Sequence, residues 1–277
     1  MPPTATELIR IAEHAEADAL ADLVGRTPAQ ARAALGLTAE VFADGILVSM
    51  PHDPTDQWSR VVGVTRWTGT ADDLVALARE RFTRSGVRRA SLHIAPAFEP
   101  DGWRETCERL GLSAGPTLVK LGAELEELAV SAAPTGPMMV RAVRPEEALS
   151  WSATMFEAFG DPADPHLAAM GAGSVDADGW VALGAWDGME LVGVGAVSVR
   201  GPAAELFGGA TLPRARRRGV QGVLIRARIE AARRAGCRWV FAEAALGSVD
   251  RPGQSLRNLR RAGLRDLGLR TGWTLTV

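Results

Sequence analysis

Apolar residues recur in the first half of the chain at two spacings, one typical of helices and one typical of strands. From Leu8 to Leu23 they fall three or four positions apart, behind a Thr4–Glu7 pair that has the form of a capping box. This pattern predicts a helix, and further helices are predicted over 70–86, with Thr70 as N-cap, and over 101–111. Short apolar runs predict strands over 45–50, 60–65, 88–95 and 117–125.

The second half shows the same two spacings. A helix is predicted over 145–159, with Pro145 in its first turn, and a hairpin over 179–199, with a tight turn at Asp187–Gly188. Helical spacing also predicts a long helix over 219–236 and a short one over 254–263. Further strands are predicted over 138–143, 204–212, 238–245 and 270–277.

The two halves repeat one order of strand, long helix, strand, short helix and strand. The short helices end alike, in RLGL and RAGL. This repeat indicates an internal duplication, with two unrelated α/β domains as the alternative. The segment 131–137 is small, uncharged and bears Pro and Gly, so we expect a linker there, between a domain over 1–130 and a domain over 138–277.

The composition and charge of the chain exclude some classes of function. The chain has 277 residues and a net charge of −2, so the molecule as a whole is not built to bind a polyanion. From Arg214 to Arg270, however, there are fifteen arginines and four acids, which indicates either a local anion site or a solvated helical face. Two distant cysteines and four scattered histidines predict no disulfide framework and no metal site. No apolar run is long enough to span a membrane and no signal pattern opens the chain, so we expect a cytoplasmic protein.

The arginine-rich region holds a pattern suited to anions. A strand is followed by a turn with the sequence Arg216-x-x-Gly219-x-Gln221-Gly222, and then by a helix. The first N–H groups of a helix lack internal partners and lie at the positive end of its dipole. Glycine lets an anion approach them closely, and arginine matches phosphate geometry. The turn lacks the glycine patterns of dinucleotide and ATP loops.

These residues resemble the GNAT superfamily of acyltransferases, whose motif between a strand and a helix is Arg/Gln-x-x-Gly-x-Gly/Ala. Arg216 and Gly219 match it, Gln221 stands where a small residue is usual, and Gly222 follows. The segments GGATLP, AGCRWVFAEA and SLRNLRRAGL lie where the family has core strands and its last helix. The resemblance covers 138–277, and the first half resembles a degenerate copy, as in tandem GNAT proteins.

The resemblance implies an α/β (α+β) fold of two tandem GNAT-like domains, each a mixed, largely antiparallel twisted sheet flanked by helices. It implies acetyl-CoA or another acyl-CoA as cofactor, with its pyrophosphate on the amides of 217–222 and its pantetheine along 209–211. Asp72 and Asp73 stand where the first half would need its phosphate turn, so we expect one cofactor per chain. The implied cofactor-binding residues are Gly209, Ala210, Thr211, Arg216, Arg217, Arg218, Gly219, Val220, Gln221, Gly222, Ser255 and Asn258.

Acyl transfer to an amine needs an aligned thioester, a proton acceptor and a proton for the departing thiolate. Glu243, a carboxylate in an apolar strand, is the candidate base; it points either to the cofactor or to solvent. Many GNAT enzymes use a tyrosine as the acid, but this chain has none, and Gly268 stands about where it would be. The acid is therefore atypical or missing.

The acceptor is expected to be a small-molecule amine, bound by the first helix of the second half and the acidic loop after it. A solvated loop is the alternative for that segment. We expect neither nucleic acid nor membrane as a partner, and a monomer or homodimer. The competing functions are an acyl-CoA-binding protein without catalysis and an RNA-associated or aminoacyl-tRNA-dependent transferase. The candidate substrate residues are Phe156, Glu157, Phe159, Asp161 and His166.

Overall fold

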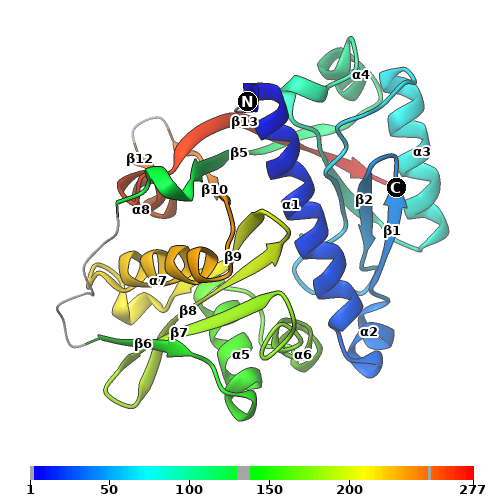
Figure 1. Ribbon diagram of the computed structural model, residues 1–277. Helices are drawn as coiled ribbons and strands as arrows, with labels where there is room; N and C mark the ends of the chain where they lie inside the picture. Colours follow the sequence, from blue (N-terminus) through cyan, green and yellow to red (C-terminus); the bar gives the residue numbers. More distant parts are fainter. Residues whose placement is uncertain (1–2, 130–137, 249–250) are drawn as a thin grey trace.

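The computed structural model describes residues 3–129, 138–248 and 251–277, shown as ribbons in Figure 1. The linker expected over 131–137 lies outside these ranges. Below, the N-terminal half means the described residues up to 129, and the C-terminal half means those from 138 onward.

The N-terminal half begins with the predicted capped helix. Thr4 Oγ1 accepts from the Glu7 N–H and the Glu7 carboxylate accepts from the Thr4 N–H, so the capping box is formed. A second capping box, between Thr70 and Asp73, opens the next long helix. The elements of this half are α1 Ala5–Arg26, α2 Ala29–Leu35, β1 Thr38–Phe42, β2 Gly45–Ser49, β3 Arg60–Val62, α3 Ala71–Arg84, β4 Arg89–His93, α4 Trp103–Arg109 and β5 Ser113–Glu124.

The C-terminal half contains the predicted hairpin, in which Asp187 pairs with Glu190 around the left-handed Gly188. A two-stranded ribbon, β11 Gly247–Ser248 and β12 Arg251–Pro252, precedes the last helix. The main elements are β6 Met138–Ala142, α5 Ala148–Phe159, α6 Pro165–Ala172, β7 Trp180–Asp187, β8 Glu190–Arg200, β9 Ala203–Thr211, α7 Val220–Arg234, β10 Trp239–Ala245, α8 Gln254–Arg261 and β13 Arg265–Thr276.

Both halves contain one order of elements: a hairpin, a strand, a long helix, a parallel strand, a short helix and a final strand. In the first half these are β1, β2, β3, α3, β4, α4 and β5, and in the second half β7, β8, β9, α7, β10, α8 and β13. Each half has one parallel pair, β3 with β4 and β9 with β10. The matching topology favours a duplication over two unrelated domains.

All main strands form one sheet of eleven strands, in the order β1-β2-β3-β4-β13-β5-β10-β9-β8-β7-β6. The last strand of each half lies beside the other half: β13 pairs with β4, and β5 pairs with β10. The two strands also pair with each other. The halves expected from the sequence are thus joined by exchanged strands rather than by the linker alone.

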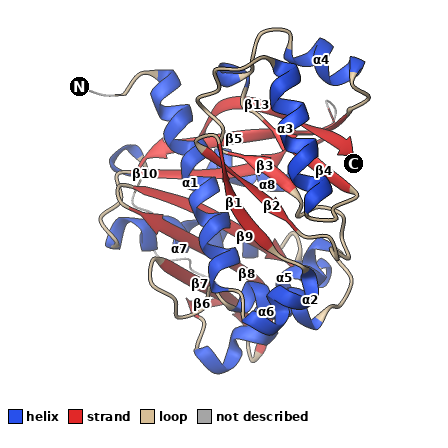
Figure 2. Cartoon of the chain, turned by 90° about the vertical axis from the view of Figure 1, so that its right-hand side faces the viewer, coloured by secondary structure: helices blue, strands red, loops and turns tan. Residues whose placement is uncertain are grey.

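The helix α1 lies across the middle of this sheet (Figure 2) and contacts strands of both halves, among them β2, β9 and β13. Alternate residues of β10 show the two faces of the sheet. Phe241 packs with Ala12 and Ala15 of α1, whereas Val240 packs with Ile225 of α7 and Leu256 of α8. The α1 face and the α7 face therefore carry separate cores.

Candidate active site

The helix α7 begins without a side-chain cap. Its N-cap is Gly219, in the left-handed region at φ 82°, and within the described part of the chain no side chain accepts from its first N–H groups. Arg217, two residues before, is also left-handed at φ 62°. These two positive φ angles turn the chain from β9 into the helix. The uncapped N–H groups and the positive end of the helix dipole together favour an anion.

A cavity of about 1610 Å³ opens at this turn, between the end of β9, the start of α7 and the helix α8. Gln221 joins the two helices: its amide donates to Ser255 Oγ at 2.9 Å and accepts from the Asn258 amide. All twelve residues expected to bind the cofactor line this cavity: Gly209, Ala210, Thr211, Arg216, Arg217, Arg218, Gly219, Val220, Gln221, Gly222, Ser255 and Asn258.

The parallel strands β9 and β10 separate beside the cavity. They pair from Ala203–Trp239 to Leu206–Ala242, and the pairing ends there although both strands continue. The β9 strand also has a bulge, because its register with β8 skips between Ala210 and Phe207, and Gly208 in the bulge has φ 59°. An unpaired strand edge with backbone polar groups thus faces the splay between β9 and β10.

Most arginines of the second half are paired with nearby acids. Arg218 binds Asp187 at 2.7 Å, and Arg214 binds Glu190 and lies 3.5 Å from Glu157. Arg216 instead donates to the backbone oxygen of Ala158 at 3.1 Å. Among the described residues, the cavity-lining arginines without an ion pair are Arg216, Arg217, Arg226 and Arg261. Four arginines without an ion pair to a described residue therefore gather at the cavity.

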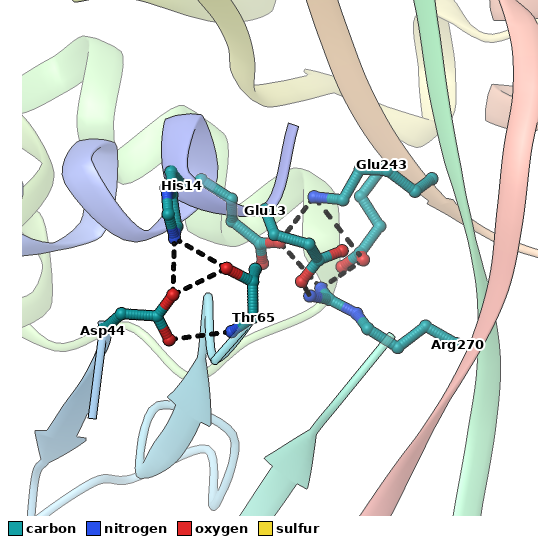
Figure 3. A network of polar contacts seen from close by, with 8 residues as sticks. Glu13, His14, Asp44, Thr65, Glu243 and Arg270 are labelled. Atoms are coloured by element: carbon teal, nitrogen blue, oxygen red, sulfur yellow. Dashed lines mark hydrogen bonds and ion pairs between the residues drawn. The ribbon is translucent and has the colours of Figure 1, made fainter. Parts of the chain in front are cut away.

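Glu243 points to neither place expected from the sequence. It lies on the α1 face, and its carboxylate pairs with Arg270 and lies 3.9 Å from Lys120 Nζ. Figure 3 shows Glu13, Glu243 and Arg270 pointing toward one another. Arg270 also binds Glu13 at 2.6 Å and Glu16 at 2.7 Å, and Glu16 binds Lys120.

Burial and neighbouring charges together shift the pKa values of the groups in this ion cluster. Burial raises the pKa of Glu243 even with Arg270 beside it, and raises the pKa of Glu205, on the same face, to about 8. For Glu16 the opposite holds, because Arg270 and Lys120 outweigh burial and lower its pKa. Burial, with Arg270 and Arg60 nearby, lowers the pKa of His93 well below its usual value.

The comparisons with known proteins agree with this geometry. Residues 143–250 match the acetyltransferase (GNAT) family. The C-terminal half carries a GNAT domain. No curated protein matches the chain. Among the described residues, no helix combines the length and the apolar character that crossing a bilayer requires.

Solved structures extend the fold to the whole chain. A GCN5-related N-acetyltransferase from Kribbella flavida is 18% identical with a TM-score of 0.64, over 95% of this chain and 94% of that one. A tandem GNAT protein from the clavulanic acid biosynthesis pathway is 16% identical with a TM-score of 0.60, over 99% and 97%. A GCN5-related N-acetyltransferase from Sphaerobacter thermophilus is 16% identical with a TM-score of 0.62, over 83% and 79%. The chain has the tandem GNAT fold.

The residues expected to hold the acceptor differ in their exposure and surroundings. Phe156 was expected to contact the acceptor, but its side chain is only 4% exposed. It packs in the core beside Trp58, because α5 turns that side toward the sheet. Phe159 is exposed and lines the cavity, and Glu157 is exposed near Arg214. Asp161 is half-buried, and burial raises its pKa, as does Asp53 across from it. His166 is half-buried in the first turn of α6.

Besides Lys120, which is 2% exposed, two further buried cations were not foreseen. Arg270 and Arg228 are 1% and 3% exposed, the first at the centre of the ion cluster and the second beneath the bulge of β9. A signal existed for Arg228, since it follows Leu224 by four positions and precedes Ile229, on the buried stripe of α7. No group of acids, histidines and cysteines in the described ranges has the arrangement of a metal site.

Proposed function

We propose that the protein is an N-acyltransferase that moves an acyl group, most simply acetyl, from acyl-CoA to a small-molecule amine by direct transfer. The observation that carries this proposal is the coincidence of three features in one cavity. These are the uncapped start of α7, four arginines without ion pairs, and the splay of β9 from β10.

The residues present suit an acyl-CoA. A Cβ built on Gly219 would meet no described residue within 4 Å, so these residues leave the space in front of the first turn of α7 open to an anion. The N–H groups of 217–222 would hold the pyrophosphate, with Arg217 and Arg226 adding charge. The free edge of β9 from Gly209 to Thr211 would pair with the pantetheine as an added strand does.

Acyl transfer requires two groups from the protein: a hydrogen-bond donor to the thioester oxygen and an acceptor for the amine proton. The bulge of β9 supplies backbone N–H groups near Ala210 and Thr211. The backbone of Glu243 follows the last β9–β10 pair, and burial raises its pKa, which suits a base. Its carboxylate turns to the α1 face, however, so it must leave the ion pair with Arg270 before it can take a proton from an amine at the splay. We therefore propose slow transfer, with Glu243 as base and water as the acid.

The missing tyrosine can be tested directly. A Cβ on Gly268 would meet no described residue within 4 Å, and Gly268 pairs with Lys120, which pairs on its other side with Glu243. Gly268→Tyr should therefore fold. Acetyl transfer measured across pH should rise in this variant and fall in Glu243→Gln by about 10²-fold, the usual range for a proton-transfer group. Wild-type rates in both variants would mean that neither residue acts in the reaction.

A second candidate function is acyl-CoA binding without catalysis. It is favoured by the Arg270 ion pair, which occupies Glu243, and by the absence of tyrosine from the sequence. Both functions need the same cofactor site. They differ in turnover: a binding protein would leave acetyl-CoA intact with every amine supplied.

The cofactor site is tested by calorimetry with CoA on Gly219→Val. The matched control is Gly236→Val, because Gly236 at the other end of α7 is equally left-handed, at φ 76° against 82°, and equally open. Both variants carry the same backbone strain, but only the first fills the anion space. We expect CoA affinity to fall at least 10-fold in Gly219→Val alone. Equal binding by both variants, or no binding by the wild type, would refute the proposal.

A further inference from the structure

Arg228 is a buried cation that has no carboxylate partner among the described residues. It is 3% exposed in the middle of α7, on the side facing the sheet. Its guanidinium makes two long hydrogen bonds, from Nε to the oxygen of Leu224 at 3.3 Å and from Nη1 to the oxygen of Phe207 at 3.4 Å. Burying a charge with so few partners is costly, so the position calls for an explanation.

Two glycines make room for this guanidinium. A Cβ on Gly209 would lie 2.7 Å and 2.8 Å from its two terminal nitrogens, and a Cβ on Gly195 would lie 3.0 Å from Nε. Both glycines belong to the region where the register of β8 and β9 skips. Arg228 therefore fills the space directly beneath the bulge. A side chain larger than that of glycine at position 195 or 209 would crowd the guanidinium out of this space.

The bulge also borders the cavity. Gly209 and Ala210 line the cavity, and Arg228 bonds the carbonyl of Phe207 at the start of the bulge. The guanidinium thus fixes the peptides next to the proposed donor at Ala210. It also places a positive charge next to Gly209, which lines the cavity. In a site shielded from water, such a charge acts strongly on neighbouring atoms.

We infer that Arg228 is a positioning residue for acyl transfer, which orients the bulge and whose charge polarises the thioester held against it. This inference rests on the proposed function. In the transfer the amine nitrogen forms a C–N bond with the carbonyl carbon, and the C–S bond breaks with its electron pair on sulfur. The amine gives one proton to the base or to water. Negative charge gathers first on the carbonyl oxygen and then on sulfur, so a fixed cation nearby lowers the barrier. Arg228 would thereby compensate in part for the missing phenol.

The test uses acetyl-CoA labelled with ¹³C at the thioester carbonyl, bound to the full chain and observed by NMR. A polarised carbonyl moves its resonance downfield from that of free acetyl-CoA. We expect a clear downfield shift in the wild type, loss of most of it in Arg228→Met, and partial retention in Arg228→Lys. Arg234→Met is the control, because Arg234 is exposed on the last turn of α7. It should show the wild-type shift.

The outcomes separate the inference from the function on which it rests. A wild type that binds no acetyl-CoA would overturn both. A folded Arg228→Met with the full wild-type shift, or one that no longer binds acetyl-CoA, would overturn only the role of Arg228. If Arg228→Met does not fold, Arg228→Lys decides: a smaller shift than in the wild type supports the inference, and an undiminished shift refutes it.

Discussion

The helices α3 and α7 hold the same place in the two halves, but their first turns are opposite in chemistry. Thr70 and Asp73 cap α3 from within, and Asp72 of that turn binds Arg109 at 2.7 Å. The matching positions in α7 are Gly219 and Gly222, and they provide no cap. At the start of α3 the backbone N–H groups are capped by side chains of the same turn. At the start of α7, within the described residues, they have no side-chain cap.

The strand before each helix repeats this difference. Gly63 after β3 and Gly208 in β9 both have positive φ, at 77° and 59°, which aligns the two bends. Beyond the first bend, the N–H groups of Thr65 and Arg66 donate to Asp44 at 2.8 Å and 2.9 Å. The matching residues in β9 line the cavity. A few acids in the first copy bind the backbone groups that in the second copy face the cavity.

The exchanged strands make the two halves parts of one folded unit, which can be tested by cutting them apart. A fragment of residues 138–277 would leave β13 without β4 and β5, and β10 without β5. We expect no folded monomer, seen as loss of native far-UV circular dichroism or as self-association in sedimentation. A monomeric fragment with wild-type CoA affinity would show that the two halves are separate, independently folding domains.

Converting the open helix start into the closed one should abolish the cofactor site. Gly222→Asp places at α7 the acid that Asp73 places at α3, and a Cβ there meets only Arg226 Nη1 at 3.6 Å. We expect CoA affinity to fall about 100-fold by repulsion, while the acid near the helix start stabilises the fold by about 0.3–1 kcal/mol. Calorimetry and thermal unfolding measure the two effects.

The matched control for that change is Gly222→Asn, which has nearly the same shape and no charge. Its CoA affinity should stay within about 5-fold of the wild type, since the repulsion is absent. Equal losses in both variants would mean that the space, rather than the charge, distinguishes the two helix starts.

A smaller effect, on the pH dependence of stability, should arise where the two halves carry different ionisable groups at matching positions. By strand pairing, Glu205 matches Arg60, and Glu243 matches His93. Burial raises the pKa of Glu205 from 4.5 to about 8. A raised pKa means that stability is fully present below pH 4.5 and is lost as pH rises toward 8, because only the unfolded state is ionised between them.

Glu205→Gln removes this titration. Its advantage in urea unfolding should be near zero at about pH 4.5 and grow to about 1–3 kcal/mol at pH 8.5, with the exposed Glu126→Gln flat as a control. A constant difference between Glu205→Gln and the wild type would show that Glu205 is ionised in the folded protein.

Local signals in the sequence were enough to predict most of the elements. Capping at Thr4 and Thr70 and the Asp187–Gly188 turn were predicted and are formed, because each depends on a few neighbouring residues. The cavity-lining residues from Gly209 to Gly222 lie together because a strand, a turn and a helix follow one another along the chain, whereas Ser255 and Asn258 join them from α8 by tertiary packing. The predicted strand over 60–65 proved too long, because the left-handed Gly63 ends it.

Long-range partners could not be predicted. Nothing in the pattern of 265–276 indicates that it lies between β4 and β5, because alternating residues fit any neighbouring strand. The partner of Glu243 was missed for the same reason: Arg270 is brought to it by the exchange of strands. Phe156 was misplaced because helical spacing does not tell which side of α5 faces the sheet.

If only the start of α7 accepts the proposed cofactor, the chain should bind a single acetyl-CoA, and the stoichiometry of binding shows whether it does. Titration calorimetry on the full chain should give one molecule per chain. The same value is expected for Asp73→Gly, because the loop beside α3 stays closed by Asp44. Two molecules bound to the wild type, or one molecule whose binding is unchanged in Gly222→Asp, would contradict the account.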